Sequence, residues 1–313
     1  MMRSNFSTKI SQFAVMLLLM VASFSGYAAT TLANKKTSPS AIDHAPKRVV
    51  VLNPNLLDDV ILLGIKPVGY AGNIPDYMKA NLKSVAYVGS SDDPSSWDIF
   101  YLSPDLIIGS DTYDKTLYLK LQKMAPTMLL DAQGGINSQI ENLKILGITF
   151  KKQKKAKAAI EHFRLLLKQA ETLGQAYPAT TLMLSVENNQ LLAVSSDTFA
   201  SKLLKRLGKD NIIQSKQAKA KSNHETLINI SLDEIQAKDP DQIILLLKNG
   251  DISSSKSLLD NPKWKALKAV KYHHVYYMDY DVWLGIHSLQ AIATALTQAK
   301  KTGFLAFEKF VML

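Results

Sequence analysis

One short pattern occurs twice in the chain and indicates two related lobes. Residues 102–108 read LSPDLII, and residues 238–244 read KDPDQII. Each copy follows a helix-like stretch, a proline ends that helix, and a pair of isoleucines begins an apolar run typical of a buried strand. Each half also opens with a similar strand pattern, at residues 48–52 and 181–186. We therefore expect two α/β lobes of similar construction.

The first half begins with an alternation of strand, helix and strand. Residues 47–52 form an apolar strand pattern that ends at Asn53. Residues 56–63 have apolar positions at helical spacing, with Asp58 and Asp59 as polar positions, and a second short strand pattern follows. This alternation predicts a parallel α/β sheet.

The longest helical pattern lies between the two lobes, over residues 151–177. Its apolar residues recur on one face at i, i+3 or i+4 spacing, and at ~1.5 Å per residue such a helix spans on the order of 40 Å. The predicted organisation is a flexible lead-in (30–45), an N-terminal lobe (46–150), an interlobe helix (151–177) and a C-terminal lobe (178–313).

Residues 1–29 have the pattern of a cleaved secretory signal peptide. Arg3 and Lys9 give a positive start, residues 13–24 are apolar, and small residues end the segment. The apolar run of about 12 residues is shorter than the ~20 needed to span a bilayer. Because the chain has no cysteine, lipid attachment at the cleavage site is not expected. We expect a freely diffusing periplasmic protein that is not a lipoprotein.

Composition limits the possible functions. The 313 residues are 47% hydrophobic and 20% charged, which suits a globular protein of about two domains. The lack of cysteine excludes disulfides, thiolate metal sites and cysteine catalysis. The formal net charge is +10, or +10 − 2 = +8 without the signal peptide. The densest lysine cluster, at residues 151–157, has no interleaved aromatic residues, so we expect no nucleic-acid partner.

Five segments, in this order, resemble the periplasmic substrate-binding proteins of ABC importers for iron–siderophores, haem and cobalamin. The segments are PKRVVVL (46–52), LLGIKPVG (62–69), LSPDLII (102–108), ISLDEI…PDQII (230–244) and WKALKAVK…VYYMD…W (264–283). The resemblance implies a class III periplasmic-binding-protein fold, in which two Rossmann-like α/β lobes are joined by a single long rigid α-helix. It also implies a ligand in the interlobe cleft and delivery of that ligand to an inner-membrane permease.

The run of segments is most similar to the ferric-siderophore branch of this family. The implied ligand is a ferric siderophore, with no intrinsic cofactor, and catecholate, hydroxamate and citrate-type chelates all stay open. We expect a monomer whose cleft has aromatic cover and a basic surface suited to an anionic chelate. The alternative is a haem- or bare-metal-binding receptor of the same fold. A bare-metal site needs three His, or His with carboxylates, and the chain has only six His.

An enzyme is the alternative from another functional class. The chain has no glycine-rich phosphate loop, no G-x-S-x-G elbow and no H-E-x-x-H motif. His273 and His274 are neighbours beside a strand pattern, and neighbouring side chains on a strand point to opposite faces. We therefore expect no enzymatic activity.

Ligands of open α/β sheets bind beyond the carboxyl ends of the strands, and this rule selects candidate residues. In the first lobe they are Asn53, Asn55, Tyr70, Asn73 and Tyr113, and in the second lobe they include Tyr280, Trp283 and His287. The aromatic side chains among them are suited to stacking on catecholate rings or covering an apolar chelate face.

The resemblance implies roles for some of these positions. Trp283 stands where the family has a cleft tryptophan, and His287 stands where many relatives have an arginine that meets an anionic siderophore. His287 is therefore a candidate hydrogen-bond donor, pH-sensitive charge or iron ligand. His224 corresponds to a histidine that completes the iron coordination in some catecholate binders, and Tyr280 is a second candidate iron ligand.

Two acidic residues are candidates for docking on the permease. The resemblance implies a surface acid in each lobe, seven residues before the proline of the P-D motif. That position is Asp233 in the second lobe and Trp97 in the first, where Asp98 is the neighbouring acid. An acid in the first turn of a helix, near its positive dipole end, is the alternative explanation for both acids.

Overall fold

The computed structural model of the protein describes residues 44–113, 115–214 and 227–306. The first of its two sheets is parallel throughout, with the strand order β3-β2-β1-β4-β5. Its strands are β1 (Val49–Val51), β2 (Gly69–Tyr70), β3 (Ala86–Tyr87), β4 (Leu106–Ser110) and β5 (Thr127–Leu130). The central strand β1 is completely buried, which explains its unbroken run of valines.

The helices around this sheet are α3 (Pro54–Leu62), α4 (Asp76–Lys79), η2 (Ala80–Leu82), α5 (Ser96–Tyr101), α6 (Lys115–Gln122) and α7 (Ile136–Thr149). The expected strand–helix–strand order at the start of the lobe is confirmed. Asp58 and Asp59, the polar positions of this helical pattern, are both completely buried in α3.

The second sheet is mixed, with the order β11-β10-β6-β7-β9 and with β8 pairing to β6. Its strands are β6 (Ala179–Glu187), β7 (Gln190–Val194), β8 (Lys209–Asn211), β9 (Leu227–Asn229), β10 (Gln242–Leu247) and β11 (Val275–Asp279). Strands β8, β6, β10 and β11 are parallel, whereas β7 runs antiparallel to both β6 and β9. The reversal follows from the two-residue turn between β6 and β7. Asn188 and Asn189 both have positive φ, which is the backbone of a tight hairpin and favours Asn.

Helical segments connect the strands of the second sheet or follow its last strand. They are α9 (Phe199–Arg206), α10 (Leu232–Lys238), η3 (Lys248–Gly250), η4 (Ser253–Ser255), α11 (Lys256–Asp260), α12 (Pro262–Ala266), α13 (Lys268–Lys271), η5 (Asp281–Gly285), α14 (Leu289–Lys301) and η6 (Phe304–Ala306). Each sheet packs its own apolar cluster, centred on Val50 and Ile107 in the first and on Leu184 and Leu245 in the second.

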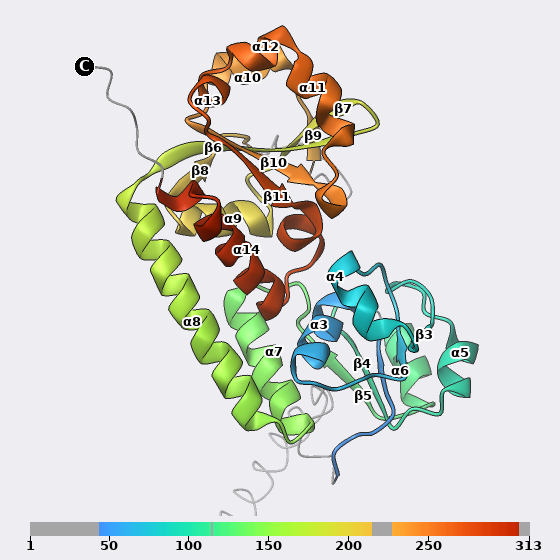
Figure 1. Ribbon diagram of the computed structural model, residues 1–313. Coiled ribbons are helices and arrows are strands. Elements are labelled where there is room, and N and C mark those ends of the chain that lie inside the picture. The colour runs from blue at the N-terminus through green and yellow to red at the C-terminus, as the bar shows by residue number, and fades with distance from the viewer. Residues whose placement is uncertain (1–43, 114, 215–226, 307–313) are drawn as a thin grey trace, which may run out of the picture. The chain divides into compact units, whose positions relative to one another are not determined.

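The expected long helix is α8 (Gln153–Ala176), which connects the part of the chain around the first sheet to β6 (Figure 1). Its 24 residues give a length of about 36 Å at the usual rise per residue. Its buried face packs against α7, α14 and η6. At Gly174 a Cβ atom would lie only 2.2 Å from the carbonyl oxygen of Leu207, so this close approach requires glycine. No helix in the described ranges is long and apolar enough to cross a membrane.

The repeated P-D motif has the same structural role in both sheets. Asp105, just before β4, accepts hydrogen bonds from the backbone N–H groups of Lys47 and Arg48, just before β1. Asp241, just before β10, accepts from the backbone N–H and the hydroxyl of Thr180 in β6. In each sheet the aspartate therefore ties two adjacent parallel strands together at their amino ends, which accounts for the sequence repeat.

Candidate ligand-binding site

The two sheets are linked near the start of α3 and the start of α14. The backbone N–H of His287 donates to Asn55 Oδ1 at 2.9 Å, and Ser288 Oγ donates to Asp58 Oδ2. Asn55 follows β1 of the first sheet, and His287 lies in the segment after β11 of the second sheet. These bonds bring together the carboxyl ends of strands from both sheets, which is where open α/β sheets bind ligands.

Two of the predicted ligand-binding residues hold the backbone at this junction. The Asn53 side chain caps α3 by accepting from the backbone N–H of Asn55 at 2.9 Å. Asn55 Nδ2 donates to the carbonyl of Ala132 at 2.7 Å, while its Oδ1 accepts from His287. Both asparagines are almost completely buried, so their polar groups position the loops that surround the junction.

Two predicted aromatic residues lie inside the lobes. The Tyr113 ring packs on the apolar cluster of the first sheet against Gly109, and its hydroxyl donates to the Leu52 carbonyl at 2.9 Å. The Trp283 side chain is only 2% exposed, and its Nε1 donates to Gln298 Oε1 at 3.1 Å. The Trp283 ring is buried and the Tyr113 ring is partly buried, and through these contacts both support the loops that follow β4 and β11.

Tyr70 and Asn73 lie at the carboxyl end of β2 in the first lobe. Tyr70 is half-buried and packs against Tyr87 of the neighbouring strand β3, with ring centroids 5.5 Å apart. Asn73 is exposed in the loop after β2. These two side chains are accessible to a ligand at this end of the first sheet.

Tyr280 belongs to a cluster of three side chains at the carboxyl ends of β6, β10 and β11. Its hydroxyl bonds the Glu187 carboxylate, and the Lys248 ammonium lies 4.6 Å from the centroid of its ring. Lys248 Nζ is also 3.0 Å from a Glu187 carboxylate oxygen. Burial, together with the Glu187 charge, raises the pKa of Tyr280 to about 12, so its hydroxyl stays protonated at neutral pH. The cluster therefore has a phenol donor, an aromatic face and a neutralised lysine.

His287 stacks on Phe199 at the start of α9, with ring centroids 4.7 Å apart. Burial lowers the pKa of His287 to about 4, so its imidazole is neutral at pH 7. It does not supply the positive charge that an arginine would supply at this position. Hydrogen bonding and metal ligation by the neutral ring stay predictions.

The other candidate iron ligand, His224, lies outside the described residues. Within the described ranges, no group of three or more His, Asp or Glu side chains is arranged to hold a metal ion.

Two acids of α3, Asp58 and Asp59, lie at the lobe junction. Asp58 accepts from the hydroxyls of Tyr77 and Ser288, and burial raises the pKa of Asp58. Burial and the neighbouring Asp58 charge raise the pKa of Asp59 well above its ordinary value, and the backbone N–H of Leu289 opposes that rise. Ser288 is the N-cap of α14, so both acids face the positive end of that helix. Two adjacent acids within an otherwise apolar helix were the signal in the sequence.

The carboxyl-end edge is defined here as the last residue of each parallel strand and the segment that follows it, up to the next α-helix or strand. In the described ranges this edge has eight acidic residues and one lysine, Lys248. The acids are Asp92, Asp93, Asp111, Asp131, Glu187, Asp251, Asp279 and Asp281. The described part of this edge is therefore acidic, while the expectation of a basic cleft stays a prediction for the site as a whole, because residues 215–226 lie outside the described residues. The net positive charge of the protein lies elsewhere, chiefly on helix surfaces such as that of α8.

The candidate docking acids lie on the corresponding helices α5 and α10. Asp98 is exposed in the first turn of α5, next to Trp97, whose side chain is 72% exposed. Asp233 is exposed in the first turn of α10, and its carboxylate pairs with Lys263 of α12 at 2.7 Å. Both acids also lie near the positive end of a helix dipole.

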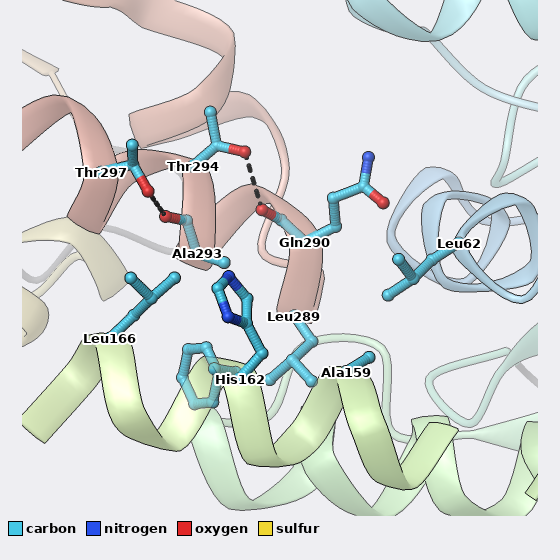
Figure 2. Close-up of a pocket in the computed structure, with 10 residues that line it drawn as sticks. Leu62, Ala159, His162, Leu166, Leu289, Gln290, Ala293, Thr294 and Thr297 are labelled. Atoms are coloured by element: carbon cyan, nitrogen blue, oxygen red, sulfur yellow. Dashed lines mark hydrogen bonds between the residues drawn. The ribbon is translucent and has the colours of Figure 1, made fainter. Parts of the chain in front are cut away.

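A separate groove of about 450 Å³ lies between α3, α8 and α14. Figure 2 shows His162 of α8 beside Leu289 and Ala293 of α14 in this groove. The hydroxyls of Thr294 and Thr297 bond carbonyls of their own helix, so the lining is mostly apolar. None of the predicted ligand-binding residues lines it.

Comparisons with known proteins identify relatives over most of the chain. The profile of the family described as "Periplasmic binding protein" matches residues 49–282. The chain is 32% identical to "Putative ABC transporter substrate-binding lipoprotein YhfQ" of Bacillus subtilis, over 82% of this chain and 83% of the relative. It is 28% identical to "Fe(3+)-citrate-binding protein YfmC" of the same organism, over 84% of this chain and 82% of the relative.

A solved structure has a similar fold. The petrobactin-binding protein YclQ of Bacillus subtilis superposes with a TM-score of 0.70 at 23% identity, over 85% of this chain and 94% of that chain. The two lobes and the connecting helix are therefore the fold of this group of proteins.

The expected localisation is contradicted by one of these relatives. YhfQ is named a lipoprotein, which indicates a membrane-anchored protein rather than a freely diffusing one. The expectation of a non-lipidated protein rested on one residue type, the missing cysteine, and it does not stand against this comparison.

Proposed function

The chain belongs to the periplasmic binding protein family, and from this premise we propose that it is the substrate-binding component of an ABC importer. Its ligand is a ferric siderophore, held at the junction of the two lobes and then delivered to a membrane permease. The names of YfmC and YclQ, which refer to Fe(3+)-citrate and petrobactin, support an iron chelate as the ligand. The role is non-enzymatic, and the iron chelate is cargo rather than a cofactor.

The observation that carries this proposal is the bond between His287 and Asn55. It joins the carboxyl ends of β1 and β11, so that loops of both sheets border one site. Tyr70, Asn73 and Tyr280 contact the ligand in this proposal, because their side chains are accessible at these loops. Asn53, Asn55, Tyr113 and Trp283 position those loops through their internal hydrogen bonds.

We place Asp98 and Asp233 on the surface that contacts the permease. Both are exposed at the first turn of a helix, and the helices occupy equivalent places before the two P-D motifs. Asp233→Arg should lower uptake in cells without changing ligand affinity, and Asp210→Arg, at another exposed acid of the same lobe, is the matched control. Normal transport by the Asp233 variant would remove it from the contact.

Binding is tested by calorimetric titration of the protein with ferric siderophores of the three chelate classes, and with haemin and zinc. The proposal predicts saturable binding of a ferric chelate at submicromolar concentration and about tenfold weaker binding of the same chelate without iron. A response to haemin or zinc alone, with no response to any ferric chelate, would overturn the siderophore assignment.

A further inference from the structure

The charge of the carboxyl-end edge restricts the chemical class of the ligand. The described residues of the carboxyl-end edge, eight acids and one lysine, repel an anion and attract a cation. The acids alone do not define the site, because its location follows from the strand ends and the Asn55–His287 bond. They decide which charge the ligand brings to it.

The cluster around Tyr280 already holds a cation. The ammonium of Lys248 lies over the Tyr280 ring at 4.6 Å and against the Glu187 carboxylate at 3.0 Å. An aromatic face with a carboxylate beside it is the arrangement that binds ammonium groups. The Lys248 side chain is 57% exposed and sits on the short 3-10 turn η3, so it has room to swing into solvent. Lys248 therefore occupies the place that a ligand ammonium would take.

Several described cationic side chains are bonded away from the junction or already paired. The Arg48 guanidinium donates to the Leu102 carbonyl at the amino ends of the strands, and Arg206 pairs with Glu171 on α8. Lys79 of α4, which interacts electrostatically with Asp281, pairs with Asp76 of its own helix. The stacked imidazole of His287 adds no charge at neutral pH.

Ferric chelates differ in net charge in a way that this site would discriminate. Three hydroxamates, each with one negative charge, neutralise Fe(III), and a free amine on the chelator makes the complex cationic. Three catecholates, each with two negative charges, leave a trianion, and the ferric citrate complexes are also anionic. An anionic complex would have to be desolvated beside the carboxylates of the edge, where Lys248 is the one lysine among the described residues and is already paired with Glu187.

We infer that the site takes a ferric hydroxamate of positive or zero net charge, and that Glu187 and the Tyr280 ring receive its ammonium group in place of Lys248. This inference rests on the proposed function, because it names the chelate class for the same site. It assigns Glu187 and Lys248 opposite effects on binding, since one attracts the ligand cation and the other competes with it.

The experiment is calorimetric titration with four named chelates. They are ferrioxamine B, a linear ferric trihydroxamate with one ammonium group, its N-acetylated neutral form, ferric dicitrate and ferric enterobactin. Ferrioxamine B should bind tightest, its acetylated form about tenfold more weakly, and both anionic complexes more weakly still, as expected for loss of one charged contact.

Two variants separate charge from shape. Glu187→Gln keeps the side-chain volume and should weaken ferrioxamine B about tenfold while leaving the acetylated form within about twofold. Lys248→Ala removes the competing ammonium and should strengthen ferrioxamine B several-fold. Unfolding midpoints equal to that of the unmodified protein establish that both variants are folded.

Each contrary result has a defined meaning. Tighter binding of ferric dicitrate or ferric enterobactin, weakened by Lys248→Ala, would overturn the inference and leave the proposed function standing. Equal affinity for ferrioxamine B and its acetylated form would overturn the role of Glu187 and Tyr280 as an ammonium site. Absence of binding by every ferric chelate would overturn the proposed function itself.

Discussion

The two ends of the parallel strands differ in charge and in how their charged side chains are used. At the amino ends, the first strand residues and the segments before them have six basic residues and three acids in the described ranges. The bases are Lys47, Arg48, Lys66, Lys83, Lys123 and Lys209, and the acids are Asp105, Asp239 and Asp241. The carboxyl-end edge has eight acids and one lysine. The overall positive charge of the chain therefore gives no guide to the charge of its ligand site.

Charged groups at the amino ends bond the backbone of the protein. Asp105 and Asp241 accept from main-chain N–H groups of the neighbouring strand, and the Lys209 ammonium donates to the Tyr177 carbonyl. Burial lowers the pKa of Lys209 to about 8, and its ammonium also lies 5.6 Å from the Phe304 ring centroid. At the carboxyl ends, Glu187 bonds only side chains, those of Lys248 and Tyr280, among its recorded contacts. Asp251 and Asp279 at the carboxyl ends also accept from main-chain N–H groups, those of Ser253 and Val282, so the difference between the two edges rests on Glu187.

The largest effect should come from Trp283, a carboxyl-end residue whose buried side chain holds the fold together, as the amino-end aspartates do. Trp283→Ala removes a completely buried indole and should lower the free energy of unfolding by about 3 kcal/mol or more, measured by urea denaturation. Trp283→Phe keeps most of the ring and loses the bond to Gln298, so about 1 kcal/mol is expected. Unchanged stability together with lost ligand binding would instead place the indole in contact with ligand.

Removing either P-D aspartate should affect stability and not affinity. Asp105→Ala and Asp241→Ala each leave main-chain donors of a strand without their acceptor, at a cost of about 2 kcal/mol. The Asn variants keep an acceptor oxygen and should lose less. A calorimetric titration at a temperature where the variants are folded should give the affinity of the unmodified protein. Weakened binding by these variants would contradict the division between the two edges.

Tyr280 should show the opposite behaviour. Tyr280→Ala removes an aromatic face at the proposed site and should weaken ligand binding about tenfold, with little change in the unfolding midpoint. Tyr280→Phe retains the ring and loses only the hydroxyl bond to Glu187, so its loss of affinity should be smaller. Equal affinities of all three proteins would show that the ring does not touch the ligand.

The smallest effect should come from Asp59, whose acid lies at the lobe junction. The folded state raises its pKa well above the unfolded value of 3.8, so the folded protein retains a proton that the unfolded chain releases. The stability from this proton is complete below pH ~3.8 and is lost as the pH rises through the folded pKa. Asp59→Asn does not titrate, so its stability relative to the unmodified protein should increase with pH. Urea denaturation at pH 5 and pH 8 measures this difference, with exposed Asp92→Asn as the control.

A constant difference between Asp59→Asn and the unmodified protein across these pH values would contradict the raised pKa.

The strands and helices that pack locally could be predicted from the sequence. The buried valines of β1, the isoleucine pairs of β4 and β10 and the apolar face of α8 each have a periodicity that depends on one element alone. The reversal at β7 was missed, although Asn188-Asn189 is a hairpin signal, because the apolar run before it matched a parallel strand.

The site was harder to predict, because its side chains depend on distant partners. Asp58 and Asp59 are buried because Tyr77 and the start of α14, with its N-cap Ser288, pack against them. The helical periodicity of α3 contains no information on these partners, which lie elsewhere in the chain. The roles of Glu187 and Lys248 likewise arise only when β6, β10 and β11 lie side by side. Trp283 was placed correctly after the last strand, but its burial depends on Gln298 in α14.

The most direct test is hydrogen exchange of the protein with and without a saturating amount of the ferric chelate that binds tightest. One experiment then reports on both edges of the sheets at once. We expect slower exchange in residues 70–73, 187–190 and 279–288 at the carboxyl ends, and unchanged exchange in residues 44–48 and 239–241 at the amino ends. Protection confined to the amino ends, or spread equally over both, would contradict the assignment of the carboxyl-end edge as the ligand site.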